Sequence, residues 1–273
     1  MSPKRVTTIA SAAVGAAVGV AASAAAVLAA QANQTKNRIG PRTTVPPYHD
    51  GRYGNQHGTS IRIAVLGDSA AAGLGAASPA DTMGAIIATE VNAATNRPVL
   101  LINHAVVGAQ TKDLDAQINR ALTAPPHVAV IMVGANDITH LVPRKLSQRR
   151  LGKAVKRLKD EGIAVVMATC PDLGAIKPFP DPLRTVMRRA SAALADDQVA
   201  ISTKMGATAV PLGAILGPQF DAWPEVFFAE DQFHPSSEGY RAAAELLLPA
   251  VLFELQLAKP QLALPATATD EGP

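Results

Sequence analysis

Cysteine is almost absent from this sequence, which has 273 residues and a single thiol, Cys170. One thiol excludes any disulfide bond within the chain. Cys170 follows an apolar run at residues 163–169, so we expect it to be buried and unreactive, with a nucleophilic cysteine as the weaker alternative. Aromatic residues make up only 4% of the chain. This argues against base-stacking platforms and large aromatic sugar-binding surfaces.

Strong charge and the common nucleotide motifs are also missing. The net charge is +3, and no stretch interleaves basic and aromatic residues densely enough to indicate a nucleic-acid partner. The chain has no Gly-Lys-Ser/Thr phosphate loop and no Gly-x-Ser-x-Gly turn, which argues against P-loop enzymes and the α/β-hydrolase fold. Gly73-x-Gly75-x-x-Ser78 imitates a dinucleotide fingerprint, but it lacks the third glycine and Pro79 follows it. The sequence therefore predicts no nucleotide cofactor.

The N-terminal segment has the pattern of a targeting sequence. Lys4 and Arg5 precede an uncharged, alanine-rich stretch at residues 6–35, which contains Ala30-Gln31-Ala32. A basic flank, an apolar body and small residues at a cleavage site are typical of an export signal, although this body is long enough to cross a bilayer as a helix. We expect residues 1–35 to be an export signal or an N-terminal membrane anchor, with an alanine-rich soluble tail as the alternative. The protein would then be exported, and either anchored in the cell envelope or secreted.

The remaining chain divides into three parts. Residues 36–60, rich in proline, glycine, asparagine and threonine, are predicted to be a linker, in which His49 and His57 are solvated. Residues 61–257 are about the size of one domain with a substantial core. Residues 258–273 are predicted to be a disordered tail.

The central part alternates between strand and helix patterns. Short apolar runs predict buried strands at residues 61–66, 98–107, 128–133, 163–169 and 207–212. Helical patterns fall between and after them, at residues 81–94 (with Asp81 as the cap), 111–122, 144–161, 181–205 and 236–257. Such alternation predicts an α/β fold with a parallel sheet of about five strands, covered on both faces. The basic side of the 144–161 helix is expected to be a solvated face, with a membrane or acidic-partner patch as the alternative.

Polar and glycine-containing turns follow three of these strands: Gly67-Asp68-Ser69, Gly108 and Gly134-Ala135-Asn136-Asp137. The carboxyl ends of parallel strands lie at one edge of a sheet, where such sheets bind ligands. The segment Asp231-Gln232-Phe233-His234-Pro235, just before the last helix, can reach the same edge. We therefore expect these four segments to form one site.

The residue types in these segments match the needs of acyl transfer. The hydroxyl of Ser69 becomes a nucleophile when a base such as His234 takes its proton, and Asp231 is close enough in sequence to orient that histidine. The backbone N–H groups of Ser69 and Gly108, together with the side-chain amide of Asn136, could bind the oxyanion that forms. Each motif alone is more often a turn or a helix cap. Their joint occurrence at strand ends favours catalysis.

In this order the four segments resemble the blocks of the SGNH (GDSL-type) hydrolases, and the resemblance covers residues 61–257. It implies a three-layer α/β/α flavodoxin-like sandwich with esterase, lipase or carbohydrate-deacetylase activity and no metal or other cofactor. By position, Ser69 would be the nucleophile, His234 the base and Asp231 its orienting acid, and Gly108 and Asn136 would complete the oxyanion hole.

Two further features bear on this resemblance. Ala70 stands where the family's name pattern has leucine, which is a packing position and leaves the chemistry intact. The export segment and Thr-Cys-Pro-Asp-Leu-Gly at residues 169–174 are similar to exported actinobacterial members.

The predicted function is hydrolysis of carboxylic esters with short- to medium-chain acyl or O-acetyl groups, through an acyl-enzyme. The alternatives are a non-catalytic envelope binding module that retains the fold, and a polysaccharide or peptidoglycan O-deacetylase that uses the same triad. The expected partners are ester substrates of small-molecule, lipid or carbohydrate type and a possible membrane tether through the N-terminal segment. The chain itself is expected to be a monomer.

Two side-chain groups have weaker interpretations. Phe227 and Phe228, with Trp223 nearby, would line an acyl pocket or pack the core of their loop. A metal site built from Asp231, His234, His104 and His140 lacks ligand-type spacing, so we predict no metal.

Overall fold

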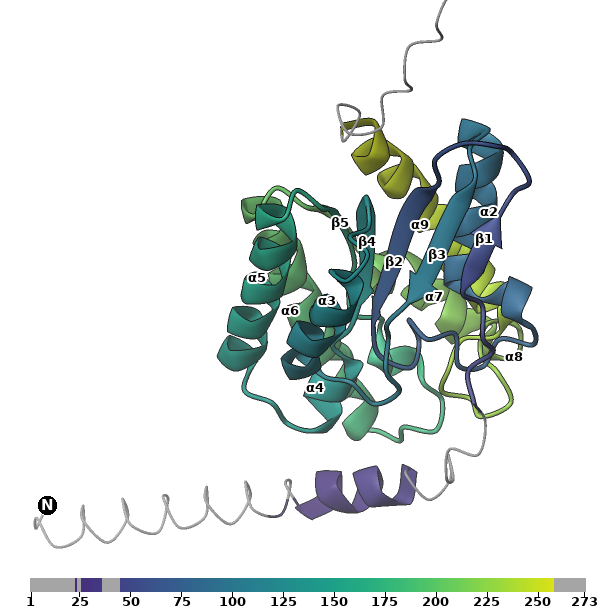
Figure 1. Cartoon of the computed structure of the whole chain (residues 1–273). Helices are drawn as coiled ribbons and strands as arrows, with labels where there is room; N and C mark the ends of the chain where they lie inside the picture. Colours follow the sequence, from purple (N-terminus) through teal and green to yellow (C-terminus); the bar gives the residue numbers. More distant parts are fainter. Residues whose placement is uncertain (1–22, 24–25, 36–44, 258–273) are drawn as a thin grey trace, which may run out of the picture.

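The computed structural model describes residues 23, 26–35 and 45–257 (Figure 1). Its strands are β1 (Gly51–Tyr53), β2 (Ile61–Gly67), β3 (Val99–Asn103), β4 (Val128–Met132), β5 (Ala164–Ala168) and β6 (Thr208–Val210). Its longer helices are α2 (Met83–Thr95), α3 (Leu114–Ala121), α5 (Arg144–Asp160), α6 (Leu183–Lys204), α7 (Leu212–Ala222) and α9 (Ser237–Leu257). The short helices are η1 (Pro79–Asp81), η2 (Thr111–Asp113), α4 (Ala135–Thr139), η3 (Leu173–Ala175) and α8 (Pro224–Phe227).

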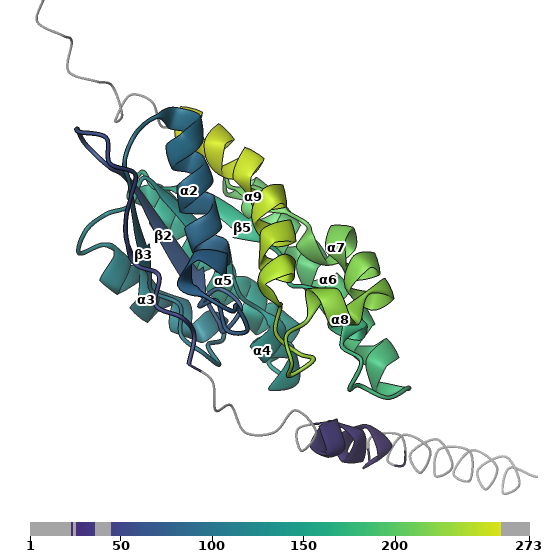
Figure 2. The same ribbon diagram turned by 90° about the vertical axis from the view of Figure 1, so that its right-hand side faces the viewer.

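The strands form one sheet in the order β1-β3-β2-β4-β5-β6. All neighbouring pairs are parallel except β1 with β3, which is antiparallel. Figure 2 shows α2 and α9 side by side over one face of the sheet, while α3 and α5 lie behind it. The predicted three-layer α/β sandwich is confirmed, with six strands rather than about five.

The two faces of the central strands explain why these strands read as continuous apolar runs. On β2, Ile63 and Val65 pack in the cluster formed with α2 and α9, whereas Ala64 and Leu66 pack in the cluster formed with α3 and α5. Successive strand residues point to opposite faces, so a sheet covered on both sides needs apolar residues at every position. Because both faces are buried, the sheet is held between the two helical layers, and the loops that carry the site follow the carboxyl ends of its strands.

The strand that the sequence did not predict is β1, which lies within the segment predicted to be a linker. Its three residues pair with β3, from Gly51 opposite Leu101 to Tyr53 opposite Val99, and so cover an edge that would otherwise be unpaired. The prediction that His49 is solvated was wrong: its side chain is 6% exposed, and its Nε2 lies 2.9 Å from Asn103 Nδ2. Composition marked this segment as irregular, and a three-residue edge strand is too short to show a pattern.

Several helix boundaries also differ from the prediction. Thr82, not Asp81, caps α2, because its Oγ1 accepts the Ala85 N–H at 3.3 Å. Asp81 instead ends η1 and accepts a hydrogen bond from the Ser78 hydroxyl at 2.7 Å. The sequence did not predict α4, α7 or α8.

The described N-terminal residues 26–35 are helical and contact the loop before α6. Gln31 Nε2 donates to the Asp181 carbonyl at 2.7 Å, and the Thr35 hydroxyl donates to the Pro178 carbonyl at 3.3 Å. None of the helices in the described part of the chain combines the length and hydropathy needed to cross a bilayer. Most of the predicted export segment, residues 36–44 of the predicted linker and the predicted tail at 258–273 lie outside the described residues.

The short loop before β4 contains a histidine whose titration is coupled to folding. His127 is buried, and its Nδ1 accepts the Arg62 N–H at 2.8 Å. Burial, followed by the charges of Arg62 and Arg97, lowers the pKa of His127 to about 4. An unfolded histidine titrates near 6.5. As the pH falls from about 6.5 to about 4, the unfolded chain therefore takes up a proton that the folded chain does not, and stability is lost.

We expect the free energy of unfolding to fall more steeply over this pH range in the wild type than in His127→Asn, by about 2 kcal/mol. The asparagine oxygen can still accept from Arg62, so the variant removes the titration while keeping an acceptor. Urea unfolding at a series of pH values measures the difference. Parallel stability curves for the two proteins would contradict the prediction.

Candidate active site

Ser69 lies in a tight turn directly after β2, and this turn depends on the surroundings of Gly67. Gly67 has φ +141°, and a Cβ there would lie 1.8 Å from the Met132 carbonyl oxygen, so glycine is required. The buried side chain of Gln117 binds Gly67 twice: Oε1 accepts its N–H at 2.7 Å and Nε2 donates to its carbonyl at 2.8 Å. The turn places Ser69, which is 5% exposed, at the carboxyl edge of the sheet.

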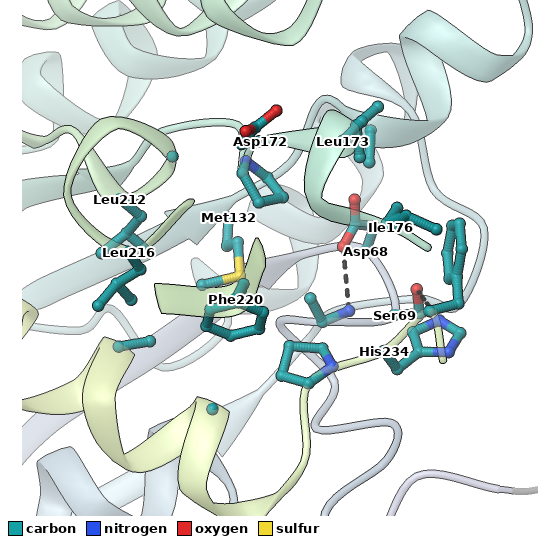
Figure 3. Close-up of a pocket in the computed structure, with 18 of the residues that line it drawn as sticks. Asp68, Ser69, Met132, Asp172, Leu173, Ile176, Leu212, Leu216, Phe220 and His234 are labelled. Atoms are coloured by element: carbon teal, nitrogen blue, oxygen red, sulfur yellow. Dashed lines mark hydrogen bonds between the residues drawn. The ribbon is translucent and has the colours of Figure 1, made fainter. Parts of the chain in front are cut away.

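His234 reaches this serine from the loop between α8 and α9. The loop closes on itself, because the Ala229 N–H donates to the His234 carbonyl at 2.8 Å and Phe228 pairs with Pro235 as an isolated bridge. His234 Nε2 then lies 3.0 Å from Ser69 Oγ (Figure 3). The structure thus brings together two residues that are 165 positions apart in the chain.

Asp231 fixes the orientation of this histidine from within the same loop. Its Oδ2 lies 2.5 Å from His234 Nδ1, and its Oδ1 accepts the backbone N–H groups of Phe233 and His234, each at 2.9 Å. A carboxylate can only accept, so Nδ1 carries the proton and Nε2 is left as the acceptor for the Ser69 hydroxyl. Burial opposes ionisation of Asp231, but the hydrogen bonds from His234 and Phe233 outweigh it, and the pKa of Asp231 is lowered. The carboxylate form therefore prevails at neutral pH.

The predicted oxyanion-binding groups lie at the ends of three neighbouring strands. Among the described residues, no backbone carbonyl accepts a hydrogen bond from the N–H of Ser69 or Gly108. Asn136, at the start of α4, is 7% exposed and lines the same cavity as Ser69. Its Nδ2 donates to the Ala109 carbonyl at 3.0 Å, which joins α4 to the Gly108 loop. Gly108 itself does not line the cavity, but the next residue, Ala109, is hydrogen-bonded to Asn136.

Buried polar side chains to which the sequence assigned no role support these loops. The Asp137 carboxylate accepts the Thr111 hydroxyl at 2.6 Å and the Ser147 hydroxyl at 2.6 Å, which ties α4 to the segment after Gly108. Gln198 of α6 is fully buried and links the ends of β4 and β5, donating to the Val133 carbonyl at 2.8 Å and accepting the Cys170 N–H at 2.6 Å. A glutamine on the buried face of a helix is the only signal in the sequence that could have indicated such a role.

Cys170 is 1% exposed, and burial raises the pKa of its thiol well above the usual value, with the nearby Asp68 adding to the rise. The prediction that this thiol is buried is confirmed, and its raised pKa is consistent with the prediction that it is unreactive. Among the described residues, no group of three or more His, Cys, Asp or Glu side chains is arranged to hold a metal ion.

A cavity of about 100 Å³ opens beside Ser69. Its wall is formed by the turn after β2, the ends of β4 and β5, η3, α7, the His234 loop and the first turns of α9. Phe228 lines it, whereas Phe227 stacks on Phe220 with ring centroids 5.1 Å apart. Trp223 is 55% exposed and does not line the cavity. Of the three aromatics, therefore, only Phe228 faces the site.

In this three-layer α/β fold, a serine, a histidine and a carboxylate lie together at the carboxyl edge of the sheet. The relatives of the chain make it a serine hydrolase that acts on carboxylic esters. The chain belongs to the GDSL-like lipase/acylhydrolase family, whose sequence model matches residues 65–242. It is 37% identical over 237 residues to the GDSL-like esterase Rv1075c of Mycobacterium tuberculosis (strain ATCC 25618 / H37Rv), an alignment that covers 82% of this chain and 76% of that one.

Solved structures share the fold at lower identity. The psychrotrophic esterase EstA from Pseudoalteromonas sp., inhibited by monoethylphosphonate, superposes with a TM-score of 0.54 at 20% identity, over 72% of this chain and 100% of that one. The acetylxylan esterase Axe2 from Geobacillus stearothermophilus gives a TM-score of 0.53 at 19% identity, over 72% of this chain and 95% of that one. The SGNH (GDSL-type) assignment made from the sequence motifs is confirmed.

Proposed function

We propose that this enzyme hydrolyses carboxylic esters with short- to medium-chain acyl or O-acetyl groups, with Ser69, His234 and Asp231 as its catalytic triad. The observation that supports this most directly is the unbroken hydrogen-bond chain of 3.0 Å from Ser69 Oγ to His234 Nε2 and 2.5 Å from His234 Nδ1 to Asp231 Oδ2. In this arrangement the base can accept the serine proton without prior movement.

In the first half of the reaction, Ser69 Oγ attacks the ester carbonyl carbon while His234 Nε2 takes its proton. The carbonyl oxygen becomes an oxyanion, which the Ser69 and Gly108 N–H groups and Asn136 Nδ2 would bind; loss of one such donor typically costs about 100- to 1,000-fold in turnover. The intermediate then collapses, the bond to the alcohol oxygen breaks, and the alcohol takes the proton from Nε2. The acyl group remains bound to Ser69.

In the second half, water replaces the alcohol. Nε2 takes a proton from the water as its oxygen attacks the acyl carbon, and the proton returns to Ser69 Oγ as the acid leaves. Asp231 remains ionised throughout and stabilises the imidazolium that forms twice in each cycle. Its lowered pKa suits this role.

The comparisons support the ester chemistry of this proposal, since the chain is related to a GDSL-like esterase and shares its fold with esterases. Membership of this family argues against a non-catalytic binding module. For the location of the protein, we propose export to the cell envelope or beyond. That proposal depends on the composition of residues 1–35 alone.

An organophosphonate probe tests the assignment of the nucleophile directly. A fluorophosphonate loses fluoride when an activated serine oxygen attacks its phosphorus. We expect one stable adduct per chain, and peptide mass mapping should place it on Ser69. Ser78→Ala, which alters a serine in the same loop, should label like the wild type, and Ser69→Ala should not label. Stoichiometric labelling of Ser69→Ala would remove the assignment.

A further inference from the structure

The cavity beside Ser69 is long, and its far end lies away from the reacting groups. Figure 3 shows Ser69 and His234 at one end and Leu212 and Leu216 of α7 at the other, with Met132 between them. Leu212 and Leu216 are 5% and 7% exposed and belong to the same apolar cluster as the core of the sheet. A ligand attached to Ser69 could therefore extend along this cavity into apolar surroundings.

Most of the polar side chains in the wall, apart from Ser69, His234 and Asn136, already form hydrogen bonds within the protein. The pairs, with their distances, are the Asp68 carboxylate with the Ala70 N–H at 3.1 Å, the Asp172 carboxylate with the Gly174 N–H at 2.7 Å and Arg188 Nε at 3.0 Å, and the Tyr240 hydroxyl with the Leu74 carbonyl at 2.7 Å. The Thr169 hydroxyl is buried and has no partner among the described residues. Beyond Ser69, His234 and Asn136, the cavity thus offers a ligand mainly hydrocarbon contacts, which suit an alkyl chain better than a sugar.

The end of the cavity at Leu212 and Leu216 suits the acyl part of an ester better than its alcohol part. The alcohol must take its proton from His234 Nε2 and then give way to water, so its side of the site has to be open. The acyl group stays bound to Ser69 until water attacks. It therefore gains from a dry, apolar environment that does not exchange with solvent at each step.

The far wall is closed by a direct contact between α7 and the loop after β5. A Cβ on Gly213 would lie 2.7 Å from the Cys170 carbonyl oxygen, and a Cβ on Gly217 would lie 2.9 Å from Asp172 Cβ. Glycine at these two positions lets the helix approach the loop backbone at Cys170 and the side chain of Asp172. The same stretch of α7 carries Leu212 and Leu216, which line the cavity.

We propose that this cavity is the acyl-binding site, and that it makes medium-chain acyl esters better substrates than acetate esters. The inference rests on the proposed function and narrows its substrate class. Each methylene transferred from water to such a site favours binding about fourfold. Because the acyl chain stays in the cavity in the transition state, the gain appears in kcat/KM.

The test compares p-nitrophenyl acetate, butyrate and octanoate, each kept below the concentration at which it aggregates. We expect wild-type kcat/KM to rise from acetate to octanoate by at least about tenfold. Leu216→Trp fills the far end and should lower kcat/KM for octanoate by about tenfold or more, while acetate changes by no more than about twofold. Ala243→Leu, on the α9 wall of the cavity, should shift selectivity in the same direction if the tryptophan variant fails to fold.

Ile215→Trp is the matched control, because Ile215 precedes Leu216 on the same helix, is 43% exposed and does not line the cavity. It should retain the wild-type preference for octanoate. The inference is overturned if the wild type prefers acetate, or if folded Leu216→Trp and Ala243→Leu lower all three esters equally. Ser69→Ala is measured on the acetate ester in parallel. If acetate hydrolysis is lost in Ser69→Ala, the proposed function stands even when the inference about the acyl site fails, so a failure of one is distinguished from a failure of the other.

Discussion

Ser69→Ala should lower kcat for ester hydrolysis about 10⁶-fold, the size of the loss seen when the nucleophile of a Ser-His-Asp triad is removed. Alanine leaves no oxygen to form the acyl-enzyme, and His234 loses the only group from which it takes a proton in the first step. The remaining rate comes from binding and from the oxyanion donors, which are intact. Release of p-nitrophenol from the butyrate ester measures the loss, and pre-steady-state mixing should show no burst.

Ser78→Ala serves as the control for this measurement, since Ser78 lies in the same loop and its hydroxyl donates to Asp81 rather than to the site. It should retain the wild-type rate. If Ser69→Ala and the wild type hydrolyse the ester equally fast, the catalytic assignment is wrong, whatever the fold.

Asp231→Asn should lower kcat on the order of 10⁴-fold, with little change in KM. The asparagine oxygen can still accept the Phe233 and His234 N–H groups, so the loop keeps its shape. Its amide group, however, donates toward Nδ1. The imidazole then carries its proton on Nε2, which faces Ser69 Oγ and can no longer act as the base.

The matched control for Asp231→Asn is Glu230→Gln, which removes one negative charge from the exposed neighbouring residue. We expect it to leave kcat within about twofold, since charges exposed to solvent are well screened. Steady-state kinetics on the butyrate ester separate kcat from KM. A loss of similar size in both variants would show that general electrostatics, rather than the tautomer of His234, controls the rate.

The sequence predicted the elements whose residues repeat a strong pattern. The strands β4 and β5 are apolar at every position, and β2 is interrupted only by Arg62, because helices cover both faces of the sheet. Such runs can be recognised without a structure. By contrast, β1 has three residues and obtains its partner from β3, which follows it in the chain by more than 40 residues. The helix α7 contains Gly213, Gly217 and Pro218, which have low helix propensity, and its two glycines lie against the loop after β5.

Some residues of the candidate site could likewise be predicted from the sequence, and others could not. Ser69, Asp231 and His234 could be named from the sequence because their chemistry and local spacing are distinctive. Gln117 and Gln198 could not, because a buried glutamine acquires its role only when a particular backbone carbonyl and N–H lie opposite it. The cavity is a product of tertiary packing between β4, β5, α7 and α9, and no local pattern predicts its depth.

The location of His234 late in the chain has a consequence for synthesis on the ribosome. The nucleophile is made early, but its base and acid come more than 160 residues later, just before α9. That helix is needed as well, since Tyr240 is fully buried and its hydroxyl donates to Leu74, in the loop after Ser69. A nascent chain therefore carries a chemically silent serine until almost all of the domain has emerged, and any truncation before Asp231 yields a protein without esterase activity.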